Sequence, residues 1–317
     1  MKVGILGAGG IAGTVSGTLE QMAEISCYAV ASRDKAKAEK FANEHGYEKA
    51  YGSYEEMLQD PEVELVYIAT PHSHHFEHMK MCVEHGKPAL CEKAFCENAD
   101  QAGRIAELAK EKKVYVSEAI WPRYMPSRKM IDETLSSGII GKVYTLTANL
   151  SYTISHKERI IRPELAGGAL LDIGVYGINF MLMHFGDDIE RIESAVRFTE
   201  TGVDGDESIT VFYRDGRMAV LTHSIYPRSD RKGIFHGDKG YMVVENINNP
   251  SEINVYDTND RLIKHMDVPK QISGYEYEFL ESIDCVQKGR IESTSMPLAE
   301  SVKMMEIMDE VRSGWKK

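Results

Sequence analysis

The chain has 317 residues, of which 43% are hydrophobic and 27% charged, and its formal net charge is −12. This length exceeds that of a typical single domain, so we expect two domains, each large enough to bury its own core. The acidic balance, without a block of lysines and arginines, argues against nucleic acid or an anionic membrane surface as a partner. An anionic ligand would therefore need a local binding site.

The cysteines and the apolar segments bear on the compartment of the protein. Five cysteines, an odd number, are scattered along the chain without a Cys-x-x-Cys pair, which is typical of free thiols in a reducing compartment. No apolar run approaches the roughly 20 residues that a membrane-spanning helix needs, and the N-terminus lacks the pattern of a secretory signal. We therefore expect a soluble cytoplasmic protein.

Short apolar runs alternate with amphipathic stretches through the first third of the chain. We predict strands over residues 2–6, 25–31, 65–69, 88–91 and 114–117, with helices between them that end near residues 22, 45, 59, 85 and 112. Nearly continuous apolar strands separated by helices indicate a parallel sheet covered on both faces. The sequence thus predicts an α/β domain of the doubly wound Rossmann type over residues 1–120.

The pattern changes near residue 120, where a proline-punctuated stretch, residues 121–126, predicts a hinge. Beyond it we predict strands over residues 143–152, 192–198, 208–213, 218–224, 231–236, 241–244 and 253–256, and helices near 126–138, 174–185, 274–288 and 297–312. Asp215-Gly216 and the segment 238–240 are typical of hairpin turns. Residues 121–317 are therefore predicted to form an α+β domain with a large, mostly antiparallel sheet.

The segment after the first strand reads Gly7-Ala-Gly9-Gly-Ile-Ala12, a Gly-x-Gly-x-x-Ala loop between a strand and a helix. The first glycine allows a tight turn, the second lets the backbone approach a pyrophosphate, and Ala12 lets the helix pack close to the strand. Gly10 and Ile11 complete the loop, where free N–H groups at the helix N-terminus favour an anion. We therefore predict a dinucleotide-binding site; the alternative is a glycine-rich turn without a ligand.

The end of the second strand distinguishes between two cofactors. NAD-binding domains usually carry an acid there, which accepts a hydrogen bond from the ribose 2′-hydroxyl. Here the strand ends in Ala-Ser32-Arg33, and the first acid is Asp34. A hydroxyl and a guanidinium suit a 2′-phosphate, so we predict NADP(H) over NAD(H). In the alternative interpretation, Arg33 is only a solvated residue and Asp34 caps the next helix.

Reactive residues are expected where parallel strands end, because a bound dinucleotide lies across their carboxyl ends. Thr70 and Pro71 follow the predicted strand 65–69, and we expect them to form a wall beside the ribose or the nicotinamide. Glu92 and Lys93 follow the predicted strand 88–91. A lysine beside a carboxylate at this place would lie near the hydride-transfer centre, although such a pair, taken alone, is more often a surface ion pair.

Longer motifs at matching spacing resemble those of one enzyme family. They are the loop 7–12, Ala69-Thr-Pro-His-Ser-His-His75, Gly86-Lys-Pro-Ala-Leu-Cys-Glu-Lys93 and Gly167-Gly-Ala-Leu-Leu-Asp-Ile-Gly-Val-Tyr176. Over nearly the whole chain the sequence resembles the glucose–fructose oxidoreductase / inositol dehydrogenase / MocA family. Within it, the stretches 50–56, 118–121, 168–172 and 200–204 look most like those of the dimeric dihydrodiol dehydrogenases.

The resemblance implies roles for individual residues. Lys93 matches the family's catalytic lysine, and Tyr176 occupies the position of the proposed general acid/base. Asp172, one helical turn before Tyr176, would share its face and orient the substrate or the tyrosine. An ammonium such as that of Lys93 would favour the tyrosinate, which would take the hydroxyl proton while hydride passes to the nicotinamide. His75 matches a recurrent family histidine that we expect near the cofactor.

Two residues depart from the family pattern. Ala94 replaces the proline of the usual Glu-Lys-Pro, which removes a backbone constraint but keeps Lys93. Asn179 stands where many sugar-oxidising members have an acid, which weakens the case for an inositol-like substrate. The resemblance therefore implies a dehydrogenase acting on CH–OH groups without naming its substrate.

Some polar and aromatic residues have less defined roles. Trp121 and Arg123 lie at the hinge, where substrate binding and packing between domains are equally good interpretations. His156 and Arg159 lie in a predicted loop and are weaker candidates for the same cleft. A cluster of four histidines contains an i,i+4 pair, but no carboxylate or cysteine completes a site, so we expect no metal; its members are His72, His74, His75 and His78.

From these observations we predict an NADP(H)-dependent oxidoreductase acting on a secondary alcohol or hemiacetal of a sugar, polyol or dihydrodiol. One alternative is a redox-assisted glycosidase of the same family, but such enzymes generally hold NAD, which Ser32-Arg33 disfavours. The other is a catalytically silent NADP-binding sensor, which the joint presence of Lys93, Asp172 and Tyr176 disfavours. We expect residues 121–317 to bind the substrate and to form a homodimer through an exposed sheet face with few charges.

Overall fold

The computed structural model describes residues 1–315. Its contacts divide the described residues into two compact units: one contains residues 1–124 and 271–302, and the other contains residues 125–270 and 303–315. The polypeptide therefore passes from one unit to the other at three places. The first unit is discontinuous in the sequence.

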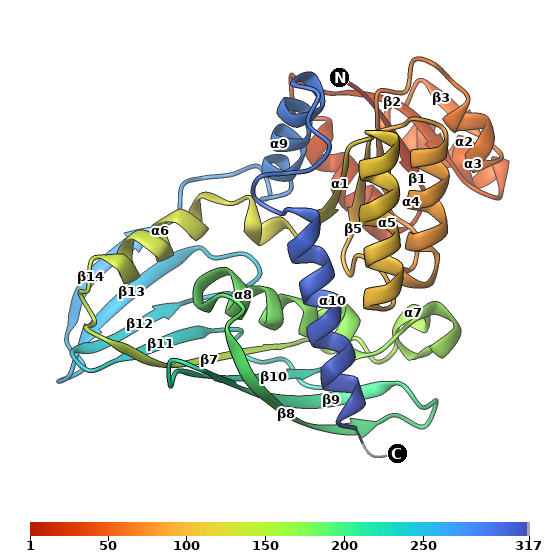
Figure 1. The fold of residues 1–317 in the computed structure, drawn as a ribbon. Helices are drawn as coiled ribbons and strands as arrows, with labels where there is room; N and C mark the ends of the chain where they lie inside the picture. The colour runs from red at the N-terminus through yellow and green to blue at the C-terminus, as the bar shows by residue number, and fades with distance from the viewer. Residues whose placement is uncertain (316–317) are drawn as a thin grey trace. The chain divides into compact units, whose positions relative to one another are not determined.

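The first unit is built on a six-stranded sheet with the order β3-β2-β1-β4-β5-β6 (Figure 1). Its strands are β1 (Lys2–Leu6), β2 (Ser26–Ala31), β3 (Lys49–Tyr51), β4 (Leu65–Ile68), β5 (Ala89–Glu92) and β6 (Val116–Ala119). Every adjacent pair is parallel, and β4, β5 and β6 are buried along their whole length. The strand order is that of a dinucleotide-binding fold, which confirms the predicted Rossmann architecture.

The helices of this unit are α1 (Gly10–Leu19), α2 (Lys35–His45), α3 (Tyr54–Leu58), α4 (His75–Glu84), α5 (Ala99–Lys112) and α9 (Glu276–Gln287). Short polar side chains begin several of them. Ser53 accepts a hydrogen bond from the Glu56 N–H at 3.1 Å, and Asn98 accepts one from the Gln101 N–H at 3.0 Å. Each satisfies a donor that the first helical turn leaves open. Gly46, with φ of +69°, ends α2 in the left-handed conformation that favours glycine.

Residues 271–302 belong to the first unit, whereas the sequence-based division at residue 120 assigned them to the second domain. Phe279 of α9 is fully buried, and its ring lies 5.3 Å from that of Tyr67 in β4. Tyr115 Oη lies 3.0 Å from Ser282 Oγ, and the Val116 N–H donates to the Ile291 carbonyl. This packing places the segment in the first core, a long-range contact that no local pattern reports.

The second unit is built on an eight-stranded sheet with the order β14-β13-β12-β11-β7-β10-β9-β8, in which only the β7–β10 pair is parallel. The predicted, mostly antiparallel sheet is confirmed. Its strands are β7 (Val143–Ser151), β8 (Ile189–Phe198), β9 (Asp204–Tyr213), β10 (Met218–Ser224), β11 (Gly233–Gly237), β12 (Gly240–Val244), β13 (Glu252–Asp257) and β14 (Leu262–Asp267). The sequence did not predict β3, which is only three residues long, or β14, which is almost entirely exposed and shows no alternation.

Helices α6 (Pro126–Ser136), α8 (Val175–Phe185) and α10 (Leu298–Ser313) lie over one face of this sheet, and Figure 1 shows the opposite face without a helix over it. Phe180 of α8 packs on Phe235 of β11 with ring centroids 5.4 Å apart. Ser194 of β8 donates to the Val311 carbonyl of α10 at 3.0 Å. A short helix, α7 (Glu158–Ile161), and a π-helical turn, Leu170–Gly174, precede α8.

The segment Pro163–Phe185, which contains α8, is 23 residues long and apolar enough by composition to cross a membrane. Sequence inspection did not single it out, so the expectation that no run approaches that length was too strong. In the structure, 89% of its most apolar window is buried inside the protein. A core helix meets the same criteria, and burial of α8 against the sheet accounts for its composition.

Candidate active site

The turn after β1 depends on the absence of a side chain at Gly7. Its φ is +102°, and a Cβ added there would lie 2.9 Å from the Ala69 carbonyl oxygen. The Gly7 N–H donates to the Ala31 carbonyl at 2.9 Å, which joins the turn to the end of β2. Only glycine therefore lets the backbone pass this closely between the ends of two neighbouring strands.

The start of α1 is open to a ligand. Gly9 precedes the helix without a side-chain cap, and both it and Gly10 are exposed, with nothing within 4 Å of an added Cβ. Ala12 is fully buried and Ile11 packs against the core, so the helix lies close on the sheet. The backbone N–H groups of the first turn can therefore receive a pyrophosphate, as the loop pattern predicts.

Of the three residues after β2, Ser32 is buried, whereas Arg33 and Asp34 are exposed. Ser32 is buried, and its Oγ accepts a hydrogen bond from the Asp34 N–H at 3.3 Å. The Asp34 carboxylate accepts from the Lys37 N–H at 3.2 Å and thereby caps α2. Arg33 is exposed; burial lowers the pKa of His78 to about 4, and the charge of Arg33 adds to this shift. Asp34 is thus occupied at a helix start, whereas Arg33 is accessible; its contact with a phosphate stays a prediction.

His75 connects two of the turns at the carboxyl edge of the parallel sheet. One ring nitrogen, Nε2, lies 2.8 Å from the Thr70 carbonyl oxygen, and Nδ1 lies 2.7 Å from that of Ala94. The ring is fully buried, and this burial lowers its pKa to about 4. A neutral ring donates to one of the two oxygens. His75 was expected near the cofactor, and this stays a prediction; its two carbonyl contacts also make it a positioning residue for the Thr70-Pro71 and Lys93 turns.

Glu92 and Lys93 lie at and just beyond the end of β5, as expected. Glu92 is buried and accepts a hydrogen bond from the hydroxyl of Tyr67 in β4. Lys93 is partly exposed, and the peptide bond between it and Ala94 is cis. The surface-ion-pair interpretation does not fit Glu92, because its carboxylate points into the core and is held by a neighbouring strand.

In the second unit, Asp172 and Tyr176 lie on consecutive segments before and within α8. Asp172 is in the π-helical turn, and its Oδ1 accepts a hydrogen bond from Arg159 Nη1 at 2.6 Å. Tyr176 lies in the first turn of α8, with 8% of its surface exposed. Asp172 and Tyr176 lie four residues apart, about one helical turn in either geometry, so the expectation that they share one face stays a prediction. The ion pair joins Arg159 directly to Asp172, a contact that the sequence analysis did not predict.

The two hinge residues pack inside the first unit. Arg123 is 2% exposed, and its guanidinium pairs with the Glu300 carboxylate. Trp121 is buried and stacks on Tyr275 with ring centroids 4.3 Å apart and planes 9° apart. We therefore correct the assignment of Arg123 as a substrate-binding residue: its buried guanidinium is already paired with a half-exposed carboxylate. The stacking of Trp121 likewise fits packing.

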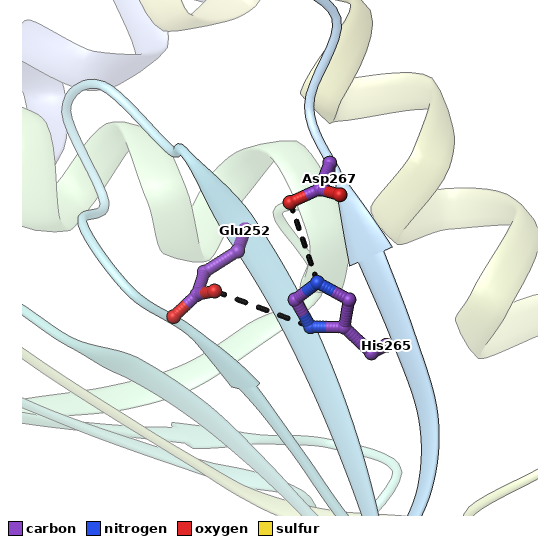
Figure 2. A group of neighbouring side chains, drawn as sticks. All are labelled: Glu252, His265 and Asp267. Carbon is purple, nitrogen blue, oxygen red and sulfur yellow. Dashed lines mark hydrogen bonds and ion pairs between the residues drawn. The ribbon is translucent and has the colours of Figure 1, made fainter.

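The histidine cluster does not form a metal site in the described chain. His78 Nδ1 lies 2.9 Å from Thr70 Oγ1, and both nitrogens of His75 face carbonyl oxygens. Figure 2 shows a separate surface group in which His265 lies between Glu252 and Asp267. Asp267 and Glu252 approach opposite nitrogens of the ring, at 3.3 and 4.0 Å. Because the two carboxylates approach opposite ring nitrogens, whereas a metal-bound histidine offers one nitrogen to the ion, we assign no metal to this group.

Comparison with protein families places this geometry in context. An oxidoreductase family model with an NAD-binding Rossmann fold, GFO_IDH_MocA, matches residues 1–120, and a GFO/IDH/MocA C-terminal domain model matches residues 129–243. The chain belongs to the GFO/IDH/MocA oxidoreductase family. Both halves of the described fold thus match one family in the expected order.

Full-length relatives carry the name trans-1,2-dihydrobenzene-1,2-diol dehydrogenase. The protein from Mus musculus is 34% identical over 99% of this chain and 96% of its own length. Those from Xenopus tropicalis and Homo sapiens are 35% and 33% identical, cover 98% and 99% of this chain, and match over 96% of their own lengths. This agrees with the branch that the sequence motifs resemble.

Solved structures share the fold. A 3-ketoreductase from Actinomadura kijaniata, in complex with NADP and TDP-benzene, superimposes with a TM-score of 0.92 at 23% identity, covering 100% of this chain and 98% of the other. An aldose–aldose oxidoreductase from Caulobacter crescentus, complexed with glycerol, superimposes with a TM-score of 0.89 at 17% identity, covering 99% and 97%. At these identities the likeness concerns the fold alone.

A buried carboxyl behind the Lys93 turn generates a prediction about pH. Glu118 of β6 accepts a hydrogen bond from the Phe95 N–H at 3.1 Å. Burial raises its pKa from 4.5 to about 7, with Arg123 opposing and Glu92 adding to the shift. Because the folded-state pKa is the higher one, this carboxyl's contribution to stability is fully present below about pH 4.5 and is lost as the pH rises to about 7.

Glu118→Gln, which does not titrate, should therefore gain stability relative to the wild type between pH 4.5 and 7. We expect the difference in free energy of unfolding between the two proteins to change by on the order of 1–3 kcal/mol. Urea unfolding on either side of this window measures it. Glu107→Gln, at an exposed position of α5, is the control and should show no such change. A difference independent of pH would contradict the assignment.

Proposed function

We propose that this family member is an NADP(H)-dependent dehydrogenase that moves a hydride between the nicotinamide and a secondary alcohol or hemiacetal carbon of a sugar, polyol or dihydrodiol. The observation that carries the proposal is the joint presence of Lys93, Asp172 and Tyr176 in a chain whose dinucleotide loop is open at a helix N-terminus. The names of the relatives support a dihydrodiol as the substrate, and the structural likeness to an aldose oxidoreductase supports a sugar.

In this proposal the nicotinamide, when bound, supplies the hydride chemistry, and the chain's own groups manage binding and proton transfer. The phenol oxygen of Tyr176 takes the hydroxyl proton as an alcohol is oxidised and returns it in the reverse direction. Lys93, which matches the family's catalytic lysine, belongs to the same proposed machinery. The carboxylate of Asp172, held by Arg159, orients the substrate hydroxyls.

The preference for NADP(H) is supported by the end of β2. Asp34, the nearest acid, already accepts a backbone hydrogen bond at the start of α2. Arg33 and the Ser32 hydroxyl are the groups at this strand end that suit a 2′-phosphate. This choice also disfavours a redox-assisted glycosidase, because such enzymes generally hold NAD. A glycosidase would also return its cofactor in every cycle, whereas a dehydrogenase consumes it stoichiometrically.

Arg33→Ala should raise the KM for NADPH by at least roughly tenfold, because a charge-assisted contact to the phosphate is lost, while the KM for NADH changes little. Steady-state rates with each cofactor measure this. Lys40→Ala removes the same charge from an exposed position of α2 and should leave both constants unchanged. An unaltered KM for NADPH in Arg33→Ala would overturn the NADP assignment.

Tyr176→Phe should lower kcat by about 100-fold or more, the usual contribution of a general acid/base, and leave the affinity for NADP+ unchanged. A panel of sugars, polyols and diols with NADP+, followed by NADPH absorbance, supplies the rates, and fluorescence titration supplies the affinity. Tyr144→Phe, at an exposed position of β7, is the matched control. If the wild type binds NADP+ but turns over no substrate in the panel, the sensor interpretation gains support.

We also propose a homodimer formed through the helix-free face of the second sheet, in the cytoplasm, where the five free thiols would stay reduced. From β9 to β13, cross-strand register aligns two rows on that face, and neither contains a carboxylate, lysine or arginine there. On β8 the rows end in Arg191 and Glu193. One row is Phe212, Met218, Thr145, His236, Tyr241 and Tyr256; the other is Thr210, Val220, Thr147, Ile234, Val243 and Asn254. Such a surface supports pairing across a two-fold axis.

Light scattering of the wild type at micromolar concentration should give twice the chain mass of 35.6 kDa. Val220→Arg places a charge in the middle of the second row and should yield monomers, because an unpaired charge would be buried in the interface. Leu280→Arg, at an exposed position of α9, should remain dimeric. A monomeric wild type would remove the dimer proposal.

A further inference from the structure

Two glycines on either side of Tyr176 lie against a pair of buried polar side chains. A Cβ added at Gly174 would lie 2.3 Å from Glu207 Oε1, and one added at Gly177 would lie 2.1 Å from His223 Nε2. Real Cβ atoms essentially never make contacts below 3.0 Å, so an alanine at either position would force the helix or its buried neighbour to shift. The backbone on both sides of Tyr176 therefore rests directly on Glu207 and His223.

Glu207 and His223 form one hydrogen-bonded unit in the sheet. They are register partners on β9 and β10, and His223 Nδ1 lies 2.8 Å from Glu207 Oε1. Both side chains are completely buried. Among the described residues, neither Glu207 Oε2 nor His223 Nε2 has a hydrogen-bond partner.

Such a pair stabilises a core less than apolar side chains would. An unsatisfied buried polar atom costs roughly 1–3 kcal/mol, and apolar side chains of the same size often pack as well or better. Its presence under the Tyr176 segment is therefore not explained by stability alone.

The Glu207–His223 pair carries no net charge near neutral pH, because both side chains are buried. Burial lowers the pKa of His223 to about 3 and raises that of Glu207 to about 8. Asp204, whose own pKa burial raises to about 7, and the Arg312 cation of α10 are the other titratable or charged groups that act on it. The pair therefore acts on Tyr176 through shape and hydrogen bonding, not through a charge.

Asp204 extends the same support to the π-helical turn. The Leu170 N–H donates to Asp204 Oδ2 at 2.5 Å, and a Cβ added at Gly168 would lie 2.2 Å from Asp204 Oδ1. The segment that carries Asp172 and Tyr176 thus rests on three polar side chains of β9 and β10, through three glycines.

We propose that the Glu207–His223 pair is a positioning device for Tyr176: through Gly174 and Gly177 it fixes the depth at which the start of α8 lies on the sheet, and with it the place of the phenol oxygen. The inference rests on the proposed function, in which that oxygen transfers the proton. A displacement of the catalytic group by about 1 Å can cost on the order of 100-fold in rate.

The first test measures whether the effects on kcat of changing Gly177 and His223 depend on each other. Gly177→Ala should lower kcat at least roughly tenfold without changing the KM for NADP+, because the added methyl displaces the helix from His223. Adding His223→Ala to Gly177→Ala makes room for that methyl, so the double variant should have a higher kcat than Gly177→Ala alone. Gly103→Ala in α5, where an added Cβ meets nothing within 4 Å, is the control and should keep the wild-type kcat.

The second test separates positioning from a merely structural role. Glu207→Gln keeps the size and hydrogen bonding of the side chain, so it should retain kcat and its pH profile, whereas Glu207→Ala should lower kcat and displace the profile. A merely structural pair would lower the Tm of the alanine variant but leave kcat per folded molecule and the profile unchanged. Additive effects of Gly177→Ala and His223→Ala on kcat, or a fully active Gly177→Ala, would overturn the proposal.

Amide hydrogen exchange over residues 168–180 tests whether the pair positions this segment, and it does so without measuring turnover. Exchange should accelerate in Gly177→Ala and return toward the wild-type rate in the double variant. If the wild type turns over no substrate, the proposed function fails while the exchange coupling stands or falls separately. Unchanged exchange in both variants would overturn the inference even in an active enzyme.

Discussion

The turns that follow three neighbouring parallel strands are tied to one another through backbone carbonyl oxygens. Gly7, after β1, passes so close to the Ala69 carbonyl that no side chain fits there. His75 then lies between the carbonyl oxygens of Thr70, after β4, and Ala94, after β5. The pyrophosphate loop and the Lys93 turn therefore share one connected edge of the sheet, so the two ends of a dinucleotide would meet a common frame.

Local patterns predicted most of this architecture because local burial produces them. Strands β4 and β5 are buried on both faces, and the predicted strands 65–69 and 88–91 read as nearly continuous apolar runs; β6 is equally buried but contains Ser117 and Glu118. The edge strand β14 carries almost no burial and hence no signal. The pattern of α9 marks a helix but not its partner, since Phe279 meets Tyr67 only after the chain has built the second unit and returned.

Some residues of the candidate site could likewise be predicted from local patterns, and others could not. Lys93 and Tyr176 could be predicted because family motifs fix their place in the chain, although their roles stay proposals. Arg123 could not be judged, because nearness to a hinge does not say whether a side chain faces a ligand or, as here, is buried and pairs with Glu300. The bond between Asp172 and Arg159, like the register pairing under α8, joins residues that no short motif connects.

The return of residues 271–302 to the first unit has a consequence for synthesis on the ribosome. A chain emerges from its N-terminus, so the six parallel strands are all translated long before α9 exists. Until Phe279 arrives, the apolar surface around Tyr67 lacks its cover. Every strand of the second sheet is made in that interval. The unit that starts the polypeptide is therefore completed only after nearly all of its companion has been translated.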